Sequence, residues 1–246
     1  MINYAHRGAS EYAPENTLSS FYLGLLQGAN GIETDVQRTK DGALVLFHDD
    51  TLERVSNGCG LLSDHTLEQL RQLQICGNAP VGFYDRIVTL RQFLEKFAHY
   101  DISFAVELKG PDVGEETLTA IREFGILEKT TFTSFHFDRI RKIKELDARA
   151  RVGYLTSDPD RAIGDLLSIG GEEIAPKAEK IELEDVVRWR ALGLGVRAWG
   201  VHNEELMKKM CDLDVDGMTV NFPDKLKRYL DGGEAAAKEG ERKLWL

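Results

Sequence analysis

The sequence contains few cysteines and no long apolar segment. Its three cysteines, Cys59, Cys76 and Cys211, form no C-x-x-C pair and are odd in number, so they predict neither a disulfide framework nor a zinc site. No apolar run approaches the ~20 residues of a membrane-spanning helix, and the N-terminus lacks the basic and apolar regions of a signal peptide. We therefore expect a cytoplasmic protein without stable membrane insertion.

The sequence is also short of positive charge. Its 31 lysines and arginines are outnumbered by 41 aspartates and glutamates, which gives a formal net charge of −10. Nucleic acid is gripped mainly through its phosphates and needs a basic surface, so we expect no nucleic acid partner. An anionic small molecule would need a local positive centre, supplied by a cation or by a few basic side chains.

The residues that are present describe a globular chain with a repeating pattern. Of the 246 residues, 42% are hydrophobic and 29% are charged, which suits one domain with a large core. Short apolar segments, typical of buried strands, alternate eight times with longer amphipathic segments, typical of helices. The predicted strands are residues 2–5, 31–36, 102–108, 130–135, 151–155, 173–176, 195–199 and 217–220. The predicted helices are residues 18–26, 89–98, 115–124, 137–146, 159–167, 183–191, 204–211 and 223–230.

This alternation predicts an α/β fold in which eight parallel strands close into a (β/α)8 barrel, or TIM barrel, over residues 1–230. A doubly wound open sheet is the alternative arrangement. The clearest helix has apolar residues at the spacing of one helical face, which we expect to be buried: Leu18, Phe21, Tyr22, Leu25 and Leu26. Pro14 and Asn16, just before it, are interpreted as helix-start residues.

Two segments depart from the repeat. Residues 31–38 and 43–48 both have the pattern of strands, and the Asp-Gly pair of Thr39-Lys40-Asp41-Gly42 between them predicts an antiparallel hairpin. Residues 51–86 hold several glycines and one short helix, where Thr66-Leu67-Glu68-Gln69 fits a capping box. We interpret them as a small insertion after the second strand, and residues 231–246 as a C-terminal tail.

Charged side chains stand where predicted strands end. In a barrel of this kind, catalytic groups come from the carboxyl ends of strands and from the loops after them. His6 and Arg7 end the first strand. Glu33 and Asp35 are two apart on the second strand and therefore point the same way, and Glu107 lies near the end of the third. We expect these side chains to meet at one mouth of the barrel.

The three carboxylates, Glu33, Asp35 and Glu107, predict a metal site. Two carboxylates aimed at one point repel each other and lose hydration, which is costly unless a cation compensates. The set offers three hard oxygen ligands and no nearby thiol, which favours Mg²⁺ or Ca²⁺ over zinc. This divalent cation would be the local positive centre that an anionic substrate needs.

Two histidines supply candidate acid and base groups. His48 ends the segment LVLFH and can face the same mouth as His6, so two imidazoles with pKa values near ~6.5 can divide proton removal and proton donation. Hydrolysis of a phosphodiester needs such a pair. Arg7 offers a planar fork for two phosphate oxygens, and Lys109 a further point charge. Trp199 ends a strand and is a candidate for the wall of an alcohol pocket.

Three segments, in this order, resemble the glycerophosphodiester phosphodiesterase family: HRGASEYAPENTLSSF, GIETDVQRTKDGALVLFHDDTLER and AVELK. The resemblance is dense over roughly the first 110 residues. It implies a (β/α)8 barrel that hydrolyses glycerophosphodiesters to an alcohol and sn-glycerol 3-phosphate with a divalent cation. By position, it implies metal ligands at Glu33, Asp35 and Glu107, an acid/base pair at His6 and His48, and phosphate contacts at Arg7 and Lys109.

Two other functions stay open at this point. A lysophospholipase D acting on lysophospholipids would need an apolar groove, which the insertion can supply through Leu61, Leu62, Val81, Phe83 and Tyr84. A non-catalytic phosphate-binding barrel would need no acid/base pair. The partner that the residues indicate is a small-molecule glycerophosphodiester, and a homo-oligomer is compatible with the sequence.

The chain differs from the family pattern near its last strands. Arg197 and His202 stand where family members often have asparagine, and Val220 and Asn221 stand where they often have a Thr-Asp pair. Because these positions lie near the far strands, we expect the differences to affect the alcohol pocket more than the chemistry.

Overall fold

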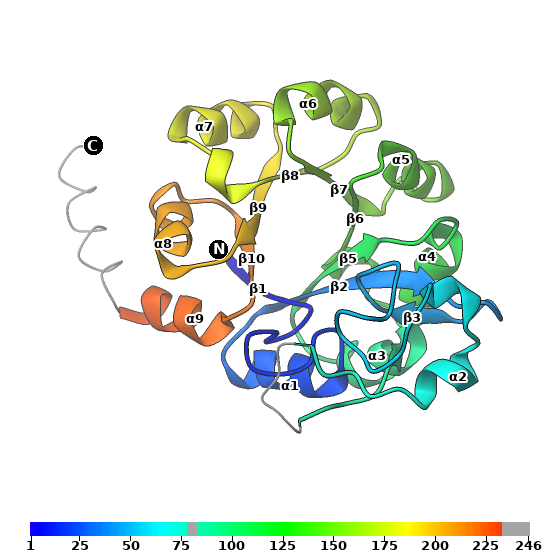
Figure 1. The fold of residues 1–246 in the computed structure, drawn as a ribbon. Coiled ribbons are helices and arrows are strands. Elements are labelled where there is room, and N and C mark those ends of the chain that lie inside the picture. Colours follow the sequence, from blue (N-terminus) through cyan, green and yellow to red (C-terminus); the bar gives the residue numbers. More distant parts are fainter. Residues whose placement is uncertain (78–82, 233–246) are drawn as a thin grey trace.

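The computed structural model describes residues 1–77 and 83–232, and eight of its strands form a ring (Figure 1). They are β1 (Ile2–His6), β2 (Gly31–Arg38), β5 (Ser103–Leu108), β6 (Thr130–Ser134), β7 (Arg151–Thr156), β8 (Glu173–Pro176), β9 (Gly195–Val201) and β10 (Gly217–Val220). Each pairs in parallel with its neighbours in this order, and β1 pairs with both β2 and β10, which closes the ring. The predicted TIM barrel is confirmed, and the open-sheet alternative is wrong.

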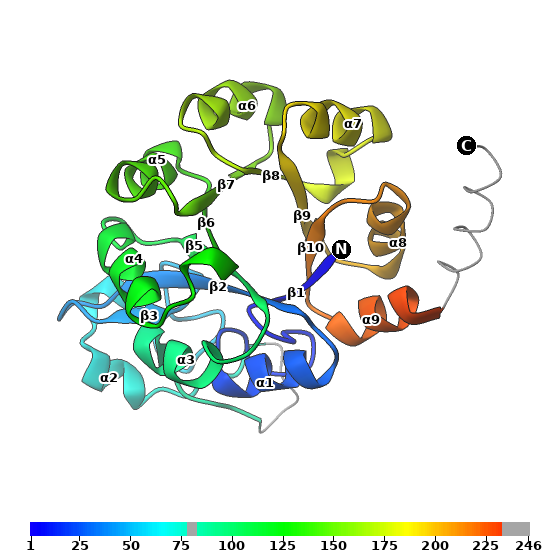
Figure 2. The same ribbon diagram turned by 180° about the vertical axis from the view of Figure 1, so that it is seen from behind.

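Helices surround the ring of strands on the outside, as Figures 1 and 2 show from opposite sides. They are α1 (Leu18–Leu26), α3 (Leu90–Phe97), α4 (Gly114–Glu123), α5 (Phe137–Leu146), α6 (Pro159–Ser168), α7 (Leu183–Ala191), α8 (Glu204–Asp212) and α9 (Pro223–Gly232). Short 3-10 helices occupy Leu62–Asp64, Leu127–Lys129 and Ala178–Lys180. The predicted strands and helices of the barrel all form, with ends within two residues of those expected.

The segment after β2 departs from the parallel repeat, as predicted. Strand β3 (Leu44–Leu46) folds back antiparallel onto β2, and β4 (Val88–Thr89) pairs antiparallel with β3. Helix α2 (Leu67–Arg71) begins with the predicted capping box, in which the Thr66 and Gln69 side chains each accept a hydrogen bond from the other residue's backbone N–H. The insertion lies at one side of the barrel, beside β3 and α3 (Figure 1).

A hydrophobic cluster separate from the main core holds the insertion together, and we call it the insertion core. Each of its members is at most 6% exposed. They are Val45, Phe47, Leu52, Val55, Leu62, Leu70, Ile75 and Ile87. Because Phe47 directly precedes His48, this cluster fixes the backbone next to a candidate catalytic residue.

The buried face of α1 differs from the predicted one. Phe21 is fully buried as expected, but Leu26 is 84% exposed. The helix buries Ser20, Phe21 and Gly24 instead. Small residues are needed at this contact because the helix lies very close to β1, where a Cβ atom on Gly24 would approach the Ala5 Cβ to 2.8 Å.

Alternation along β2 separates the barrel interior from the helix layer. Ile32 and Val36 point outward and belong to the main hydrophobic core, together with Phe21 of α1. Glu33 and Asp35 occupy the alternate positions and therefore point into the barrel. The predicted orientation of the two carboxylates follows directly from this packing.

Helix α9 ends at Gly232, two residues later than predicted. The rest of the predicted tail, residues 233–246, lies outside the described residues, as does Val81 of the insertion. The three cysteines are free thiols, as expected. Among the helices of residues 1–77 and 83–232, none has the length and apolar character needed to cross a membrane.

Gly8 makes the turn from β1 toward α1 possible. Its φ is +85°, and a Cβ atom there would lie 2.3 Å from Ser20 Oγ and 2.5 Å from the Ser20 carbonyl carbon. We expect Gly8→Ala to lower the free energy of unfolding by roughly 2–5 kcal/mol, because left-handed strain and overpacking add. Urea denaturation measures the loss.

Gly193→Ala is the matched control. The φ of Gly193 is +81°, but no atom lies within 4 Å of the position of its Cβ. This variant carries the backbone strain alone, about 1 kcal/mol. Equal losses in the two variants would contradict a packing role for the close approach of Gly8 to Ser20.

Candidate active site

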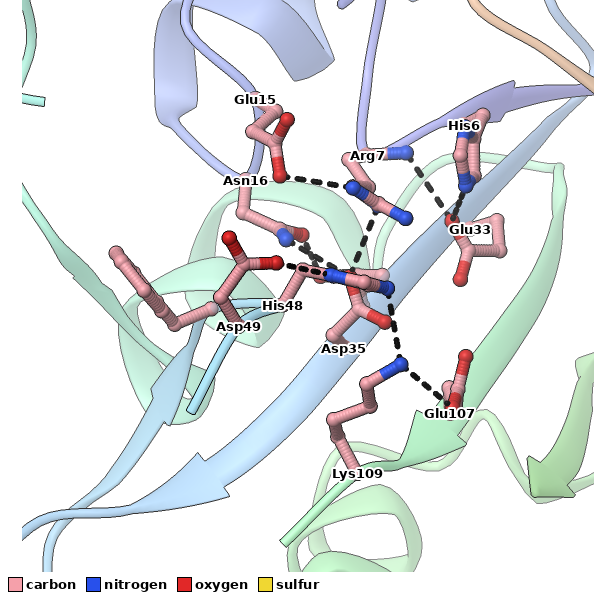
Figure 3. A network of polar contacts seen from close by, with 12 residues as sticks. His6, Arg7, Glu15, Asn16, Glu33, Asp35, His48, Asp49, Glu107 and Lys109 are labelled. Atoms are coloured by element: carbon pink, nitrogen blue, oxygen red, sulfur yellow. Dashed lines mark hydrogen bonds and ion pairs between the residues drawn. The ribbon is translucent and has the colours of Figure 1, made fainter. Parts of the chain in front are cut away.

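The predicted site residues other than Trp199 meet near the carboxyl ends of β1, β2 and β5 (Figure 3). The parallel register places His6 of β1 beside Glu33 of β2, and Asp35 of β2 beside Glu107 of β5. His48 comes from the loop after β3 and faces the same group (Figure 3). Barrel closure therefore brings together residues that are distant in the sequence.

Glu33, Asp35 and Glu107 form a buried acidic cluster. Each offers an oxygen that lies within 4.8 Å of the others, and each residue is at most 7% exposed. Burial, followed by the charge of Asp35, raises the pKa of Glu33 well above its ordinary value and the pKa of Glu107 to about 7. Burial by itself would also raise the pKa of Asp35, but the Arg7 guanidinium lowers it below its ordinary value.

The donor set of this cluster fits a divalent cation. Asp35 Oδ1 is buried and has no hydrogen-bond partner, whereas Oδ2 contacts Arg7 and Asn16. A buried carboxylate oxygen without a partner is costly, and a bound cation would satisfy it. A set of carboxylate oxygens without thiols suits Mg²⁺ or Ca²⁺.

His48 is hydrogen-bonded at both ring nitrogens. Its Nδ1 lies 2.6 Å from Asp49 Oδ1, and Lys109 Nζ lies 2.9 Å from its Nε2. Because a carboxylate only accepts and an ammonium only donates, this network assigns the ring proton to Nδ1 and the lone pair to Nε2. Lys109 also lies 3.3 Å from Glu107 Oε1 and thus links His48 to the acidic cluster.

His6 is anchored in a similar way but by a neutral group. Its Nδ1 lies 2.7 Å from Asn221 Oδ1, and its Nε2 lies 3.8 Å from Glu33 Oε2. Burial, followed by the charge of Arg7, lowers the pKa of His6 to about 3, so the ring is neutral at pH 7. Asn221, one of the departures expected to affect the alcohol pocket more than the chemistry, thus contacts a candidate catalytic ring.

Arg7 is fixed through both its backbone and its side chain. It adopts a left-handed conformation with φ 56°, which is supported by hydrogen bonds from its N–H to the Glu33 carbonyl and from the Asn16 N–H to its own carbonyl. Its Nη1 lies 2.9 Å from Glu15 Oε1, and its Nε lies 3.2 Å from Asp35 Oδ2. The guanidinium is therefore oriented before any substrate binds.

Asn16 is a site residue that the sequence reasoning missed. We interpreted it as a helix start, but α1 is capped by Thr17. The Asn16 side chain instead donates to Asp35 Oδ2 over 2.9 Å and accepts from Thr34 Oγ1 over 2.7 Å. Its φ is 56°, and the tolerance of asparagine for that conformation is the signal that could have identified it.

A cavity of about 280 Å³ lies between the acidic cluster and an aromatic wall. Phe135 and Trp199 form the wall, with ring centroids 5.1 Å apart in an edge-to-face arrangement. Phe135, predicted to end a strand, lies just beyond β6. The residues that line the cavity are His6, Arg7, Glu33, His48, Glu107, Phe135, Leu155, Arg197, Trp199, Gly200 and Thr219.

Arg197 and His202 have different places relative to this cavity. Arg197 lines it and is only 2% exposed, with Nε donating to Glu173 Oε1 over 2.8 Å and Nη2 left without a partner. His202 has a side chain that is 58% exposed and does not line the cavity. Only Arg197 of this pair therefore borders the predicted pocket.

Comparison with known proteins identifies relatives along almost the whole chain. Residues 6–225 match the model of the glycerophosphoryl diester phosphodiesterase family. A glycerophosphodiester phosphodiesterase of Caldanaerobacter subterraneus subsp. tengcongensis is 32% identical over 234 residues, which are 90% of this chain and 94% of that protein. Another from Bacillus altitudinis is also 32% identical, over 90% of this chain and 95% of its own length.

Solved structures agree with these relatives. An Oleispira antarctica phosphodiesterase, in complex with the product sn-glycerol-3-phosphate, matches with a TM-score of 0.82 and 28% identity over 93% of this chain and 96% of that one. A glycerophosphodiester phosphodiesterase from Agrobacterium tumefaciens str. C58 matches with a TM-score of 0.80 and 25% identity over 91% of this chain and 97% of that one. The enzyme class predicted from the sequence is confirmed, and the chain belongs to the glycerophosphoryl diester phosphodiesterase family.

Proposed function

We propose that this enzyme hydrolyses deacylated phospholipids to sn-glycerol 3-phosphate and an alcohol by two-histidine acid/base catalysis. The observation that carries the proposal is the convergence of two imidazoles, each anchored at Nδ1, on one cavity with a buried acidic cluster. A phosphate-binding barrel without catalysis would need the positive groups but would have no use for this pair. We therefore favour the enzyme.

In this proposal, Glu33, Asp35 and Glu107 hold a divalent cation, Mg²⁺ or Ca²⁺. A cation held there would offset the charge of the three carboxylates and would supply Lewis-acid chemistry to the phosphate. Arg7 supplies a second positive group at the same mouth and contacts the phosphate as an oriented fork. Together they form the local positive centre that a chain of net charge −10 needs for an anionic substrate.

His6 and His48 divide the proton transfers. One ring accepts at its Nε2 the proton of the nucleophile, which is either water or the glycerol 2-hydroxyl, while the new P–O bond forms. The other ring, in its protonated state, donates from Nε2 to the leaving alcohol oxygen while the old P–O bond breaks. If the 2-hydroxyl attacks, the product of this step is a cyclic phosphate, which water opens in a second step with the roles of the two rings exchanged. When His48 Nε2 carries a proton, it can no longer accept a hydrogen bond from the Lys109 ammonium. We propose that this ammonium then contacts the phosphate.

The aromatic wall of Phe135 and Trp199 would hold the alcohol part of the substrate. A lysophospholipid would need more apolar surface beside it, and no residue from the described part of the insertion lines the cavity. Leu62, one candidate for such a groove, is fully buried in the insertion core. We therefore favour glycerophosphodiesters over lysophospholipids as substrates.

We place this enzyme in the cytoplasm as a single catalytic barrel, residues 1–230. The three free thiols suit a reducing compartment. The negative net charge argues against a nucleic acid partner. The proposed partner is the small-molecule substrate.

Purified protein is expected to release sn-glycerol 3-phosphate from glycerophosphocholine or glycerophosphoethanolamine when Mg²⁺ or Ca²⁺ is present. A coupled glycerol 3-phosphate dehydrogenase assay measures the product. EDTA is expected to abolish turnover, because the carboxylates lose the cation that compensates their charge. An excess of either cation is expected to restore turnover. Failure to hydrolyse any glycerophosphodiester would disprove the proposed function.

Metal binding can be measured apart from activity. Glu107→Gln removes one anionic ligand and is expected to weaken binding of Mg²⁺ or Ca²⁺ by more than about 10-fold in a calorimetric titration. Glu179→Gln is the matched control, because Glu179 is a half-exposed carboxylate outside the cluster. Equal affinities in the Glu107 variant and the unmodified protein would exclude Glu107 as a ligand.

His6→Ala and His48→Ala are each expected to reduce kcat by about 10²–10⁴-fold, because each removes a proton-transfer group. KM is expected to change little, since Arg7 and the cation still hold the phosphate. His202→Ala is the control and should leave kcat within about twofold, because its ring lies apart from the cavity lining. Undiminished turnover in either site variant would overturn that residue's role.

A further inference from the structure

Arg54 of the insertion joins two loops at the mouth of the barrel. Its Nη1 and Nη2 donate to Glu15 Oε2 and Oε1, both over 2.8 Å. Its Nε and Nη2 donate to Asp49 Oδ2 and Oδ1 over 2.5 and 3.0 Å. One guanidinium fork therefore binds two carboxylates, one on the loop after β1 and one on the loop after β3.

Each of these carboxylates directly contacts a group of the proposed mechanism. Glu15 Oε1 also accepts from Arg7 Nη1 over 2.9 Å, and Asp49 Oδ1 lies 2.6 Å from His48 Nδ1. Figure 3 shows Glu15 beside Arg7 and Asp49 beside His48. The contacts thus form a continuous path from the phosphate-binding arginine to the catalytic ring, with Arg54 at its middle.

The charges along this path compensate one another. Burial by itself would raise the pKa of Asp49, but hydrogen bonds from Arg54 and His48 hold it at about 2. Burial would likewise raise the pKa of Glu15, which the contacts with Arg54 and Arg7 lower instead. Without Arg54, each carboxylate would keep only its partner in the site.

The insertion core holds Arg54 in place. The flanking residues Leu52 and Val55 are 0% and 2% exposed within that cluster. The Val55 carbonyl accepts from the Cys76 N–H over 2.8 Å. Phe47, next to His48, belongs to the same cluster. The insertion core therefore fixes the backbone on both sides of the segment that carries the His48 ring and the Arg54 guanidinium.

We propose that Arg54 is a positioning residue, whose fork sets the placement of His48 relative to Arg7 through Asp49 and Glu15. The inference rests on the proposed function for the roles of His48 and Arg7. A lysine would keep the positive charge but cannot bind both carboxylates in a bidentate manner. The insertion then has a definite task, which is to present this fork to the mouth of the barrel.

Arg54→Gln is expected to reduce kcat about 10²-fold with KM within about threefold, because small misplacements of a catalytic group are costly while Arg7 keeps Asp35 as a partner. The melting temperature should fall by no more than about 4 °C, since Arg54 is half-exposed. Arg54→Lys should regain the melting temperature but not kcat. An unchanged kcat in the Gln variant, or full recovery in the Lys variant, would overturn the proposal.

Arg190→Gln is the matched control. Arg190, in the last turn of α7, also binds two carboxylates, Asp214 and Asp216, and is similarly exposed, but it does not line the cavity. We expect its kcat to be unchanged. A loss of kcat as large as that of Arg54→Gln would show that the effect is one of general stability and would refute positioning.

A double variant tests the path itself. If Arg54 acts on His48 through Asp49, Arg54→Gln should lower kcat less than about threefold in an Asp49→Asn background, because coupled residues are not additive. A further loss of about 10²-fold in that background would contradict the path.

The same path has a readout that does not depend on turnover. In nitrogen-15 spectra, the His48 Nδ1–H signal, assigned by its absence in His48→Gln, should be sharp in the unmodified protein and broadened in Arg54→Gln. An unaltered signal would overturn the inference. The signal can differ between the unmodified protein and Arg54→Gln even if the unmodified protein shows no turnover. In that case the proposed function fails, while the positioning of His48 by Arg54 stands.

Discussion

The repulsion among three buried carboxylates is the constraint on which the rest of the site depends. The register of β1, β2 and β5 forces Glu33, Asp35 and Glu107 together inside the barrel. Burial and mutual repulsion make the charged forms of Glu33 and Glu107 unfavourable. Arg7 and Lys109 offset part of this charge, and the remainder is the charge that a divalent cation held there would offset.

The two imidazoles beside this cluster are anchored by chemically different partners. His6 donates to the amide oxygen of Asn221, which is neutral, whereas His48 donates to the carboxylate of Asp49, which is charged. Burial, followed by the charge of Arg7, lowers the pKa of His6 and keeps its ring neutral, although the hydrogen bond with Asn221 by itself would raise that pKa. Two rings in unlike environments are what a reaction needs when one proton is removed and another is supplied.

The barrel was predictable because its elements are regular. Strands and helices have periods of 2 and 3.6 residues, so apolar spacing gave their bounds to within two residues. The prediction of the buried face of α1 was wrong. Gly24 and Ser20 make the contact of this helix with β1, and such small residues leave no apolar pattern in the sequence. Packing distance between elements is a tertiary property that periodicity does not contain.

The site was predictable for the same reason, and only to the same extent. Glu33 and Asp35 were found because residues two apart on a strand share a face, and their meeting with Glu107 follows from barrel closure. Asn16 and Asp49 were missed because they lie in loops, where no period relates sequence distance to direction. Their contacts with Asp35 and His48 depend on how the loops fold over the barrel.

Loops at the mouth of a barrel can move independently unless something joins them, and acid/base geometry does not tolerate that freedom. Here the loop after β1 holds Arg7, and the loop after β3 holds His48. The insertion core fixes the second loop, and the fork of Arg54 ties it to the first through Glu15. The loops on the charged side of the cavity are thereby cross-linked through Arg54, and the opposite aromatic wall approaches this side where Lys109 Nζ lies 6.0 Å from the centroid of the Phe135 ring.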